Sequence, residues 1–204
     1  MISRKHRFIY IHIPKTGGNS IQSVLAPYCD DRVVFRKSAG HVIGEDGCQG
    51  LDVFNEEMGF VSPIHKHASI ADYFARIGES IASYFIFASI RNPWDRVISR
   101  TAFATPGGIR SGVLLKREDL LLPRPMTDYV SLNGAIALQE TIRFERMQAD
   151  FDRVCDRIGI DRAVLPHKNR SVRGSYAECY SDESIAYVRD SFKADIDAFG
   201  YDFM

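Results

Sequence analysis

The sequence predicts a three-layer α/β fold, in which helices flank a central and mostly parallel sheet. Two short runs of β-branched and aromatic residues, at 8–13 and 84–90, have the composition of buried strands. Each run is followed at once by a helix start, and further amphipathic helices follow in the second half of the chain. This alternation is typical of a parallel sheet covered on both faces. A single domain over residues 1–204 is expected, because this length buries a sizeable core.

The first strand and the helix after it enclose a short loop. Pro14 ends the predicted strand at 8–13, because proline interrupts the regular pattern. A helix is then expected from Gly18 or Asn19 to about Leu25.

The next part of the chain is irregular up to a clear helix start. Residues 30–62 contain scattered glycines, and we expect loops and short irregular elements there. Ser69 followed by Asp72 matches a capping box, in which a hydroxyl and an acid bond to the backbone of the first helical turn. The apolar strand 84–90 comes next, and Asn92, followed directly by a proline, caps another helix.

The second half of the chain is predicted to be mainly helical. Residues 105–125 are rich in proline and glycine and are expected to form a loop or lid. Residues 141–144 suggest a short strand, followed by a helix through Arg157. One last helix is predicted from apolar residues at helical spacing, namely Ile185, Val188, Phe192, Ile196 and Phe199.

Charge and composition exclude several functional classes. Basic and acidic residues both number 26, and there is no block of like charge, so no nucleic-acid partner is expected. The apolar run after the basic residues 1–7 is too short for a signal peptide or a transmembrane segment, and a cytoplasmic protein is expected. The four cysteines have no zinc-site spacing. We expect reduced thiols, with a Cys29–Cys48 bridge as the less favoured alternative.

The loop between the first strand and its helix is a candidate anion site. The free N–H groups of a helix start and the helix dipole favour negative charge there. The residues expected to bind the anion are a cation, two glycines and three neutral donors: Lys15, Gly17, Gly18, Thr16, Asn19 and Ser20. The alternative is a capped turn with a solvated lysine. The loop also differs from the nucleotide loop GxxxxGK[ST], because Lys15 precedes the glycine pair.

A second candidate anion site follows the strand at 84–90. Arg91 comes at the carboxyl end of this strand, where open α/β sheets bind ligands, and a guanidinium can grip a phosphate with two parallel hydrogen bonds. Ser99 lies about two turns along the next helix and would meet the same anion only along the helix flank. The alternative is a surface arginine that supports the helix start. Trp94 either stacks on a base or packs against the sheet.

Taken together, the two segments resemble the sulfotransferase superfamily, in particular the branch of carbohydrate sulfotransferases and their bacterial relatives. Residues 13–20 are similar to the 5'-phosphosulfate loop of that family, and residues 91–99 are similar to its 3'-phosphate motif. Residues 143–145 and the C-terminal tail also resemble that branch. The resemblance implies a P-loop-like fold and is weakest at 30–62 and 105–135, where acceptor specificity is expected.

The resemblance implies transfer of a sulfuryl group from 3'-phosphoadenosine 5'-phosphosulfate (PAPS) to an acceptor hydroxyl, by in-line displacement and without a metal. Lys15 would stabilise the charge on the leaving oxygen. Arg91 and Ser99 would hold the 3'-phosphate, and Arg173, in a late basic loop, is a further candidate for that contact. The acceptor is expected to be a saccharide, with a lipid or another small molecule as alternatives.

The segment at 65–67 is the best candidate for the general base. A helix N-terminus and Lys66 both disfavour an imidazolium, so a neutral His67 would accept the proton of the acceptor at pH 7. His65 is the second candidate, and some carbohydrate sulfotransferases that resemble this chain carry a His-x-His in this region. The alternative for His67 is a partly buried histidine bonded to the backbone. His12 is expected in the core.

Two other functions stay open on the sequence. A P-loop-type, kinase-like phosphotransferase would share the strand–loop–helix architecture but would need a metal site, and its usual loop motif is absent here. A catalytically inactive nucleotide-binding module would keep the fold and lose the chemistry.

Overall fold

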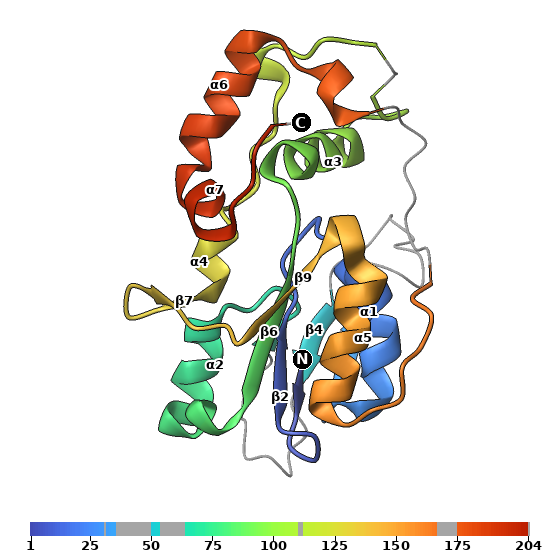
Figure 1. The fold of residues 1–204 in the computed structure, drawn as a ribbon, viewed down its shortest axis with the longest axis vertical. Coiled ribbons are helices and arrows are strands. Elements are labelled where there is room, and N and C mark those ends of the chain that lie inside the picture. Colours follow the sequence, from blue (N-terminus) through green and yellow to red (C-terminus); the bar gives the residue numbers. More distant parts are fainter. Residues whose placement is uncertain (31, 36–49, 54–63, 110–111, 167–174, 204) are drawn as a thin grey trace. The chain divides into compact units, whose positions relative to one another are not determined.

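The computed structural model describes residues 1–204 except 31, 36–49, 54–63, 110–111, 167–174 and 204 (Figure 1). The chain divides into two compact units. Unit 1 comprises Met1–Ser89 and Tyr129–Lys168, and unit 2 comprises Ile90–Asp128 and Asn169–Met204. The single domain expected over residues 1–204 stays a prediction.

The central sheet of unit 1 has the strand order β1-β2-β6-β9. Strand β2 pairs in parallel with β6, with Phe8 opposite Phe85 and Ile11 opposite Ala88. Strand β1 pairs antiparallel with β2. The strands span Ile2–Ser3 (β1), Phe8–Ile11 (β2), Phe85–Ile90 (β6) and Glu140–Arg143 (β9). The predicted α/β class, with a mostly parallel central sheet flanked by helices, is confirmed.

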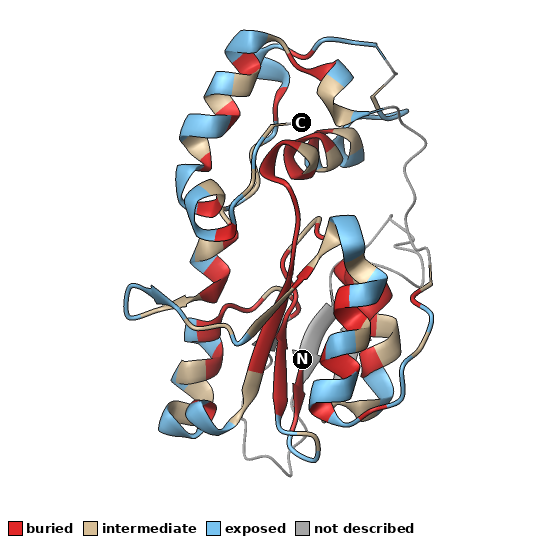
Figure 2. Ribbon diagram, in the orientation of Figure 1, coloured by how far each residue is buried: buried red, intermediate tan, exposed pale blue. Residues whose placement is uncertain are grey.

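Helices cover both faces of this sheet. Figure 1 shows α1 (Gly18–Leu25) and α5 (Met147–Ile158) together on one side, and α2 (Ile70–Ile77) on the other. Because side chains alternate along a strand, Tyr10 and Phe87 join the core beneath α1 and α5, whereas Ile86 lies with residues of α2. Strands β2 and β6 are buried along almost their whole length (Figure 2).

Residues 30–62 differ from the prediction. Three short strands, β3 (Arg32–Phe35), β4 (Gly50–Val53) and β5 (Ile64–His65), form an antiparallel sheet. The expectation of loops and irregular elements was wrong for β3 and β4, because their short segments lack a long alternating pattern. A second small hairpin joins β7 (Ser131–Leu132) to β8 (Ala135–Ile136).

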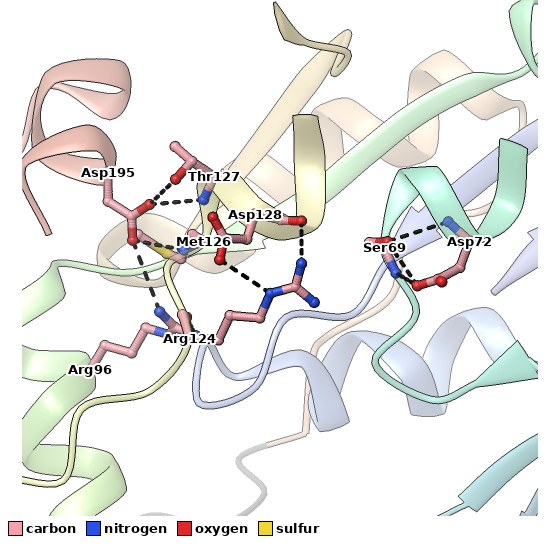
Figure 3. A network of polar contacts seen from close by, with 8 residues as sticks. All are labelled: Ser69, Asp72, Arg96, Arg124, Met126, Thr127, Asp128 and Asp195. Carbon is pink, nitrogen blue, oxygen red and sulfur yellow. Dashed lines mark hydrogen bonds and ion pairs between the residues drawn. The ribbon is translucent and has the colours of Figure 1, made fainter. Parts of the chain in front are cut away.

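The predicted helix starts are confirmed. The Ser69 hydroxyl accepts from the Asp72 N–H (3.3 Å), and the Asp72 carboxylate accepts from the Ser69 N–H (2.7 Å), as Figure 3 shows. Helix α3 (Pro93–Ala104) begins after Asn92, whose side chain accepts from the Trp94 N–H at 3.1 Å. A 3-10 turn, Arg117–Asp119, is the helical element among the described residues of the segment 105–125.

The predicted last helix is two helices. Helix α6 (Asp182–Ser191) and helix α7 (Lys193–Phe199) are separated at Phe192, whose φ of −118° and ψ of 25° leave the helical region. The prediction of one continuous helix was wrong because Val188, Phe192 and Ile196 keep helical spacing across the break. Apolar spacing reports which residues are buried, and it does not report whether the backbone bends between them.

A buried ion pair organises unit 2 (Figure 3). The Asp195 carboxylate accepts from the N–H groups of Met126 (2.7 Å) and Thr127 (2.8 Å), and from the Thr127 hydroxyl (2.9 Å). Arg96 Nη1 lies 4.0 Å from this carboxylate, and Arg96 Nη2 donates to the carbonyl of Arg124 at 2.9 Å. Asp195 thereby holds the start of α4 (Thr127–Val130) against α7.

Trp94 belongs to the core of unit 2. Its indole N–H donates to the carbonyl of Ile185 at 3.1 Å, and the side chain is fully buried among residues of α3, α6 and α7. Stacking of Trp94 on a nucleotide base is therefore not supported.

No disulfide joins Cys29, Cys155 and Cys179 in the described structure, and Cys48 lies outside the described residues, so the Cys29–Cys48 alternative stays open. In the described part of the chain, no helix is both long enough and apolar enough to span a bilayer.

Candidate active site

The loop between β2 and α1 adopts an unusual backbone. Lys15 has φ 69°, in the left-handed region that residues other than glycine rarely adopt, and Gly17 has φ 81°. A left-handed lysine costs on the order of 1–3 kcal/mol and is characteristic of ligand-binding sites. Lys15 and Gly17 therefore turn the chain sharply between β2 and α1, and the alternative of a turn with a solvated lysine stays open.

The glycine pair is required by packing inside the protein. A Cβ at Gly18 would lie 2.7 Å from the Tyr10 hydroxyl and would meet the ring of His12. A Cβ at Gly17 would lie 2.9 Å from the ring of Phe144. The sequence suggested that these glycines admit a ligand. The structure adds a second reason, since any larger residue would push the loop off the core.

The start of α1 is electropositive. Its N-cap residue, Gly17, has no side chain to form a cap bond, and its first turn carries no acidic residue. By contrast, Asp72 lies in the first turn of α2 and Asp95 in that of α3. Unshielded N–H groups at a helix start attract anions. The β2–α1 loop thus suits a phosphate or sulfate group.

A chain of hydroxyl groups anchors the loop to the sheet. The Thr16 hydroxyl donates to the carbonyl of Ile13 (2.8 Å), so its oxygen accepts from Ser89 (2.7 Å), and Ser89 in turn accepts from Tyr10 (2.7 Å). Burial raises the pKa of Tyr10 well above its ordinary value, which keeps it a donor. Thr16 is fully buried, so any ligand contact by Thr16 would come from its backbone N–H.

Lys66 lies between His65 and His67, in the histidine segment 65–67, and its side chain contacts the start of α1. Its Nζ donates to Asn19 Oδ1 at 2.8 Å, and the lysine is only 4% exposed. Asn19 is the second residue of α1, and Ser20, the third, is buried. The sequence indicated Lys66 only as a neighbour that disfavours imidazolium. Its bond to Asn19 could not be read from spacing, because the two residues lie 47 positions apart.

His67 is held in the tautomer that a general base requires. Its Nδ1 lies 2.8 Å from the carbonyl oxygen of His12. A carbonyl only accepts, so Nδ1 carries the proton, and in the neutral ring Nε2 keeps its lone pair. The backbone bond expected as the alternative role of His67 is thus present, and the role of His67 as general base stays a prediction.

His12 lies between the sheet and the loop. The ring is 4% exposed, and its centroid lies 4.9 Å from that of His67 in an edge-on contact. Burial, followed by the nearby His67 and Lys66, lowers the pKa of His12 well below its ordinary value. A neutral, buried His12 agrees with the expectation that it belongs to the core.

Two predicted site residues lie partly or wholly outside the described structure. His65 lies in β5, but its side chain is outside the described part of the structure, and Arg173 lies outside it entirely. Their roles stay predictions.

The junction between β6 and α3 differs from the first. Arg91 is 6% exposed, and its Nε and Nη2 both lie 2.6 Å from Asp95 Oδ2. Asn92 Nδ2 donates to the carbonyl of Asp202 at 2.8 Å. Ser99 is half-buried on α3. The sequence interpretation missed Asp95, although its position four residues after Arg91 is the standard spacing of a helical ion pair.

Among the described residues, no group of three or more His, Cys, Asp or Glu side chains could hold a metal ion. The metal-free site expected from the sequence stays a prediction.

Comparison with known proteins gives a similarity in the first half of the chain. Residues 1–100 match the Sulfotransferase family. This sulfotransferase segment includes both strand–helix junctions and the histidine segment, and it ends before Arg173. Comparison with curated proteins and with solved structures gave no match. The match supports the sulfotransferase superfamily and sulfuryl transfer in general.

Proposed function

We propose that the protein transfers a sulfuryl group from PAPS to a hydroxyl group of an acceptor. The observation that carries the proposal is the 2.8 Å hydrogen bond from His67 Nδ1 to the His12 carbonyl. It fixes His67 in the tautomer whose Nε2 carries the lone pair, and it ties this histidine to the residue that leads into the β2–α1 loop. The sulfotransferase match over residues 1–100 supplies the reaction class.

The phosphosulfate end of the donor is assigned to the β2–α1 loop. Unshielded N–H groups at the start of α1 would bind its oxygens, and Lys15 would stand at the oxygen that bridges phosphorus and sulfur. The remaining loop residues assigned to the donor are Thr16, Gly17, Gly18, Asn19 and Ser20.

The 3'-phosphate is assigned to Arg91 and Ser99, with Arg173 as a further contact. Parallel pairing brings the carboxyl ends of β2 and β6 to the same edge of the sheet, and Arg91 follows β6 directly in the chain. The ion pair with Asp95 fixes the guanidinium in one orientation, which lowers the entropy cost of binding an anion.

Transfer forms a bond between the acceptor oxygen and sulfur, and it breaks the bond between sulfur and the 5'-phosphate oxygen, which keeps the electron pair. His67 Nε2 takes the proton of the acceptor hydroxyl. Lys15 stabilises the charge that develops on the leaving oxygen. The products are a sulfate ester and 3'-phosphoadenosine 5'-phosphate (PAP), and His67 returns its proton to solvent. His65 is the second candidate for the base.

A saccharide is the acceptor class that we propose. This choice rests on the resemblance of the two junctions and the C-terminal tail to carbohydrate sulfotransferases.

Isothermal titration with PAP in the presence of EDTA tests the donor assignment. We expect the wild-type protein to bind PAP without magnesium, and Lys15→Ala to bind it at least about tenfold more weakly, since one charge-assisted contact is lost. Lys5→Met changes an exposed lysine of the same unit and serves as the matched control. Magnesium-dependent ATP binding without PAP binding would instead favour a phosphotransferase.

Turnover is tested with a radiolabelled sulfuryl donor and a panel of saccharide, lipid and small-molecule alcohols. We expect label transfer to a saccharide and its loss in Lys15→Ala. Tight PAP binding with no transfer to any acceptor would favour a catalytically inactive binding module.

A further inference from the structure

Lys66 and His67 are neighbours in sequence, and each makes a hydrogen bond to a different end of the β2–α1 loop. Lys66 Nζ donates to Asn19 Oδ1 at 2.8 Å, on the helix side of the loop. His67 Nδ1 lies 2.8 Å from the carbonyl of His12, on the strand side. The two bonds therefore bracket Lys15 and the glycine pair, which lie between these two attachment points in the sequence.

Resting on the donor site proposed above, we propose that Lys66 is a positioning residue that makes Asn19 a hydrogen-bond donor to the phosphosulfate and joins the base to the donor loop. The sequence indicates Lys66 only as a charge that disfavours a neighbouring imidazolium, because its partner Asn19 lies in a distant segment.

The first part of this role follows from the chemistry of the amide. An ammonium group only donates, so the Asn19 atom that faces Lys66 is the carbonyl oxygen. The amide NH₂ then takes the opposite side of the Asn19 side chain. Asn19 lies in the first turn of α1, where the N–H groups of the helix start attract an anion. Lys66 thus fixes the carbonyl end of the amide as the acceptor, and the NH₂ end is the one that would donate to the phosphosulfate.

The second part follows from burial. Lys66 is 4% exposed, so its positive charge acts through protein rather than water and is screened less than a surface charge. The loop then experiences Lys66 in addition to Lys15 and the dipole of α1. A second cation beside the loop favours the doubly charged phosphate of PAP over a neutral group at the same position.

The third part concerns the base. Catalytic groups must be held close to their productive geometry, and a side chain anchored at one point can rotate or shift. Two bonds from consecutive residues prevent the segment 66–67 from moving relative to the loop. Loss of the Lys66 bond is therefore expected to lower kcat as well as donor affinity.

Isothermal titration of Lys66→Met with two nucleotides tests the inference. Methionine keeps the apolar stem and removes the charge and the donor. We expect PAP to bind about 10- to 100-fold more weakly, the loss of a charge-assisted contact. Adenosine 3'-monophosphate, which lacks the 5'-phosphate, should change by no more than about twofold. Lys66→Arg should recover most of the PAP affinity, and Lys5→Met should behave as wild type.

A double-mutant cycle tests the link to Asn19. We expect Asn19→Ala to weaken PAP binding in the wild-type background, and to add no more than about twofold in the Lys66→Met background, because the two residues act as one unit. Equal weakening of PAP and adenosine 3'-monophosphate in Lys66→Met would indicate a general structural role and overturn the inference. Unchanged PAP affinity and kcat would also overturn it.

The wild-type protein and Lys15→Ala separate this inference from the proposed function. Absence of PAP binding in the wild-type protein would remove both proposals. If Lys15→Ala weakens PAP binding and Lys66→Met does not, only the role proposed for Lys66 is wrong.

Discussion

The two strand–helix junctions look alike in sequence and differ in structure. Each has a cation after a buried strand and a helix immediately beyond. At the β2–α1 junction the N-cap residue is Gly17, which has no capping side chain, and the first turn of the helix has no acidic residue. At the β6–α3 junction Asn92 caps the helix and Asp95 holds the guanidinium of Arg91 at 2.6 Å.

From this difference we infer that the two junctions have different roles. An uncapped helix start keeps its positive field for a ligand, which suits the group whose charge changes during a reaction. A capped helix with a paired arginine offers an oriented but partly neutralised cation, which suits a group that is only held in place. We therefore expect changes at the first junction to affect kcat as well as donor affinity, and changes at the second to affect mainly the KM of the donor.

The largest expected effect is on turnover. His67→Ala should lower kcat by about 10²–10⁴, the usual contribution of a general base, while PAP affinity stays within about twofold. Stopped-time assays with labelled donor measure kcat, and titration measures affinity. His6→Ala is the matched control, because His6 Nδ1 also lies near a backbone carbonyl, that of Ile158, at 3.2 Å. Weakened PAP binding with intact kcat would make His67 a structural residue.

At the second junction, Arg91→Ala should raise the KM for PAPS by about 10- to 100-fold, the loss of one charge-assisted anion contact, with a smaller effect on kcat. Initial-rate kinetics at varied PAPS measure both constants. Arg124→Ala is the control, because Arg124 forms an exposed ion pair with Asp128 at 3.2 Å, also four residues apart. An unchanged KM in Arg91→Ala would mean that Arg91 does not contact the donor, and the two junctions would then not have the related roles proposed above.

Local signals predicted most of the elements that carry the site. The Ser69–Asp72 capping box and the Asn92 cap act over two or three residues, and both were correct. The break at Phe192 was missed, because burial of Val188 and Ile196 continues across it. Local patterns could not predict contacts between distant segments.

The same limit applies to the site. The sequence could indicate the β2–α1 loop and Arg91 as candidates because each candidate lies in one contiguous segment. The bonds from Lys66 to Asn19 and from His67 to His12 join segments 47 and 55 residues apart, so no spacing rule could find them. Asp95 was within reach of the i, i+4 rule and was overlooked.

A smaller effect concerns stability. Gly18→Ala should lower the free energy of unfolding by about 1–3 kcal/mol, because the new Cβ crowds Tyr10 and His12. Asn92→Ala, at the N-cap of α3 in the second junction, should cost about 1 kcal/mol, the value of a helix cap. Urea unfolding measures both. A neutral Gly18→Ala would mean that the first loop tolerates displacement, contrary to the packing described above.

The smallest effect is a pH dependence specific to the first junction. Burial lowers the pKa of His12 in the folded protein, whereas the unfolded chain has the ordinary value of about 6.5. Below about pH 6.5 the unfolded chain binds the proton more readily, so the stability that neutral His12 contributes is complete above that pH. It is lost as the pH falls toward the folded value, by at most about 1.4 kcal/mol per pH unit. Urea unfolding at pH 7.5, 6.5 and 5.5 should show a shallower decline in His12→Asn than in the wild-type protein. Parallel declines would mean that His12 takes up its proton without disturbing the fold. The β2–α1 loop would then not depend on a neutral His12, and this difference from the Arg91 junction would disappear.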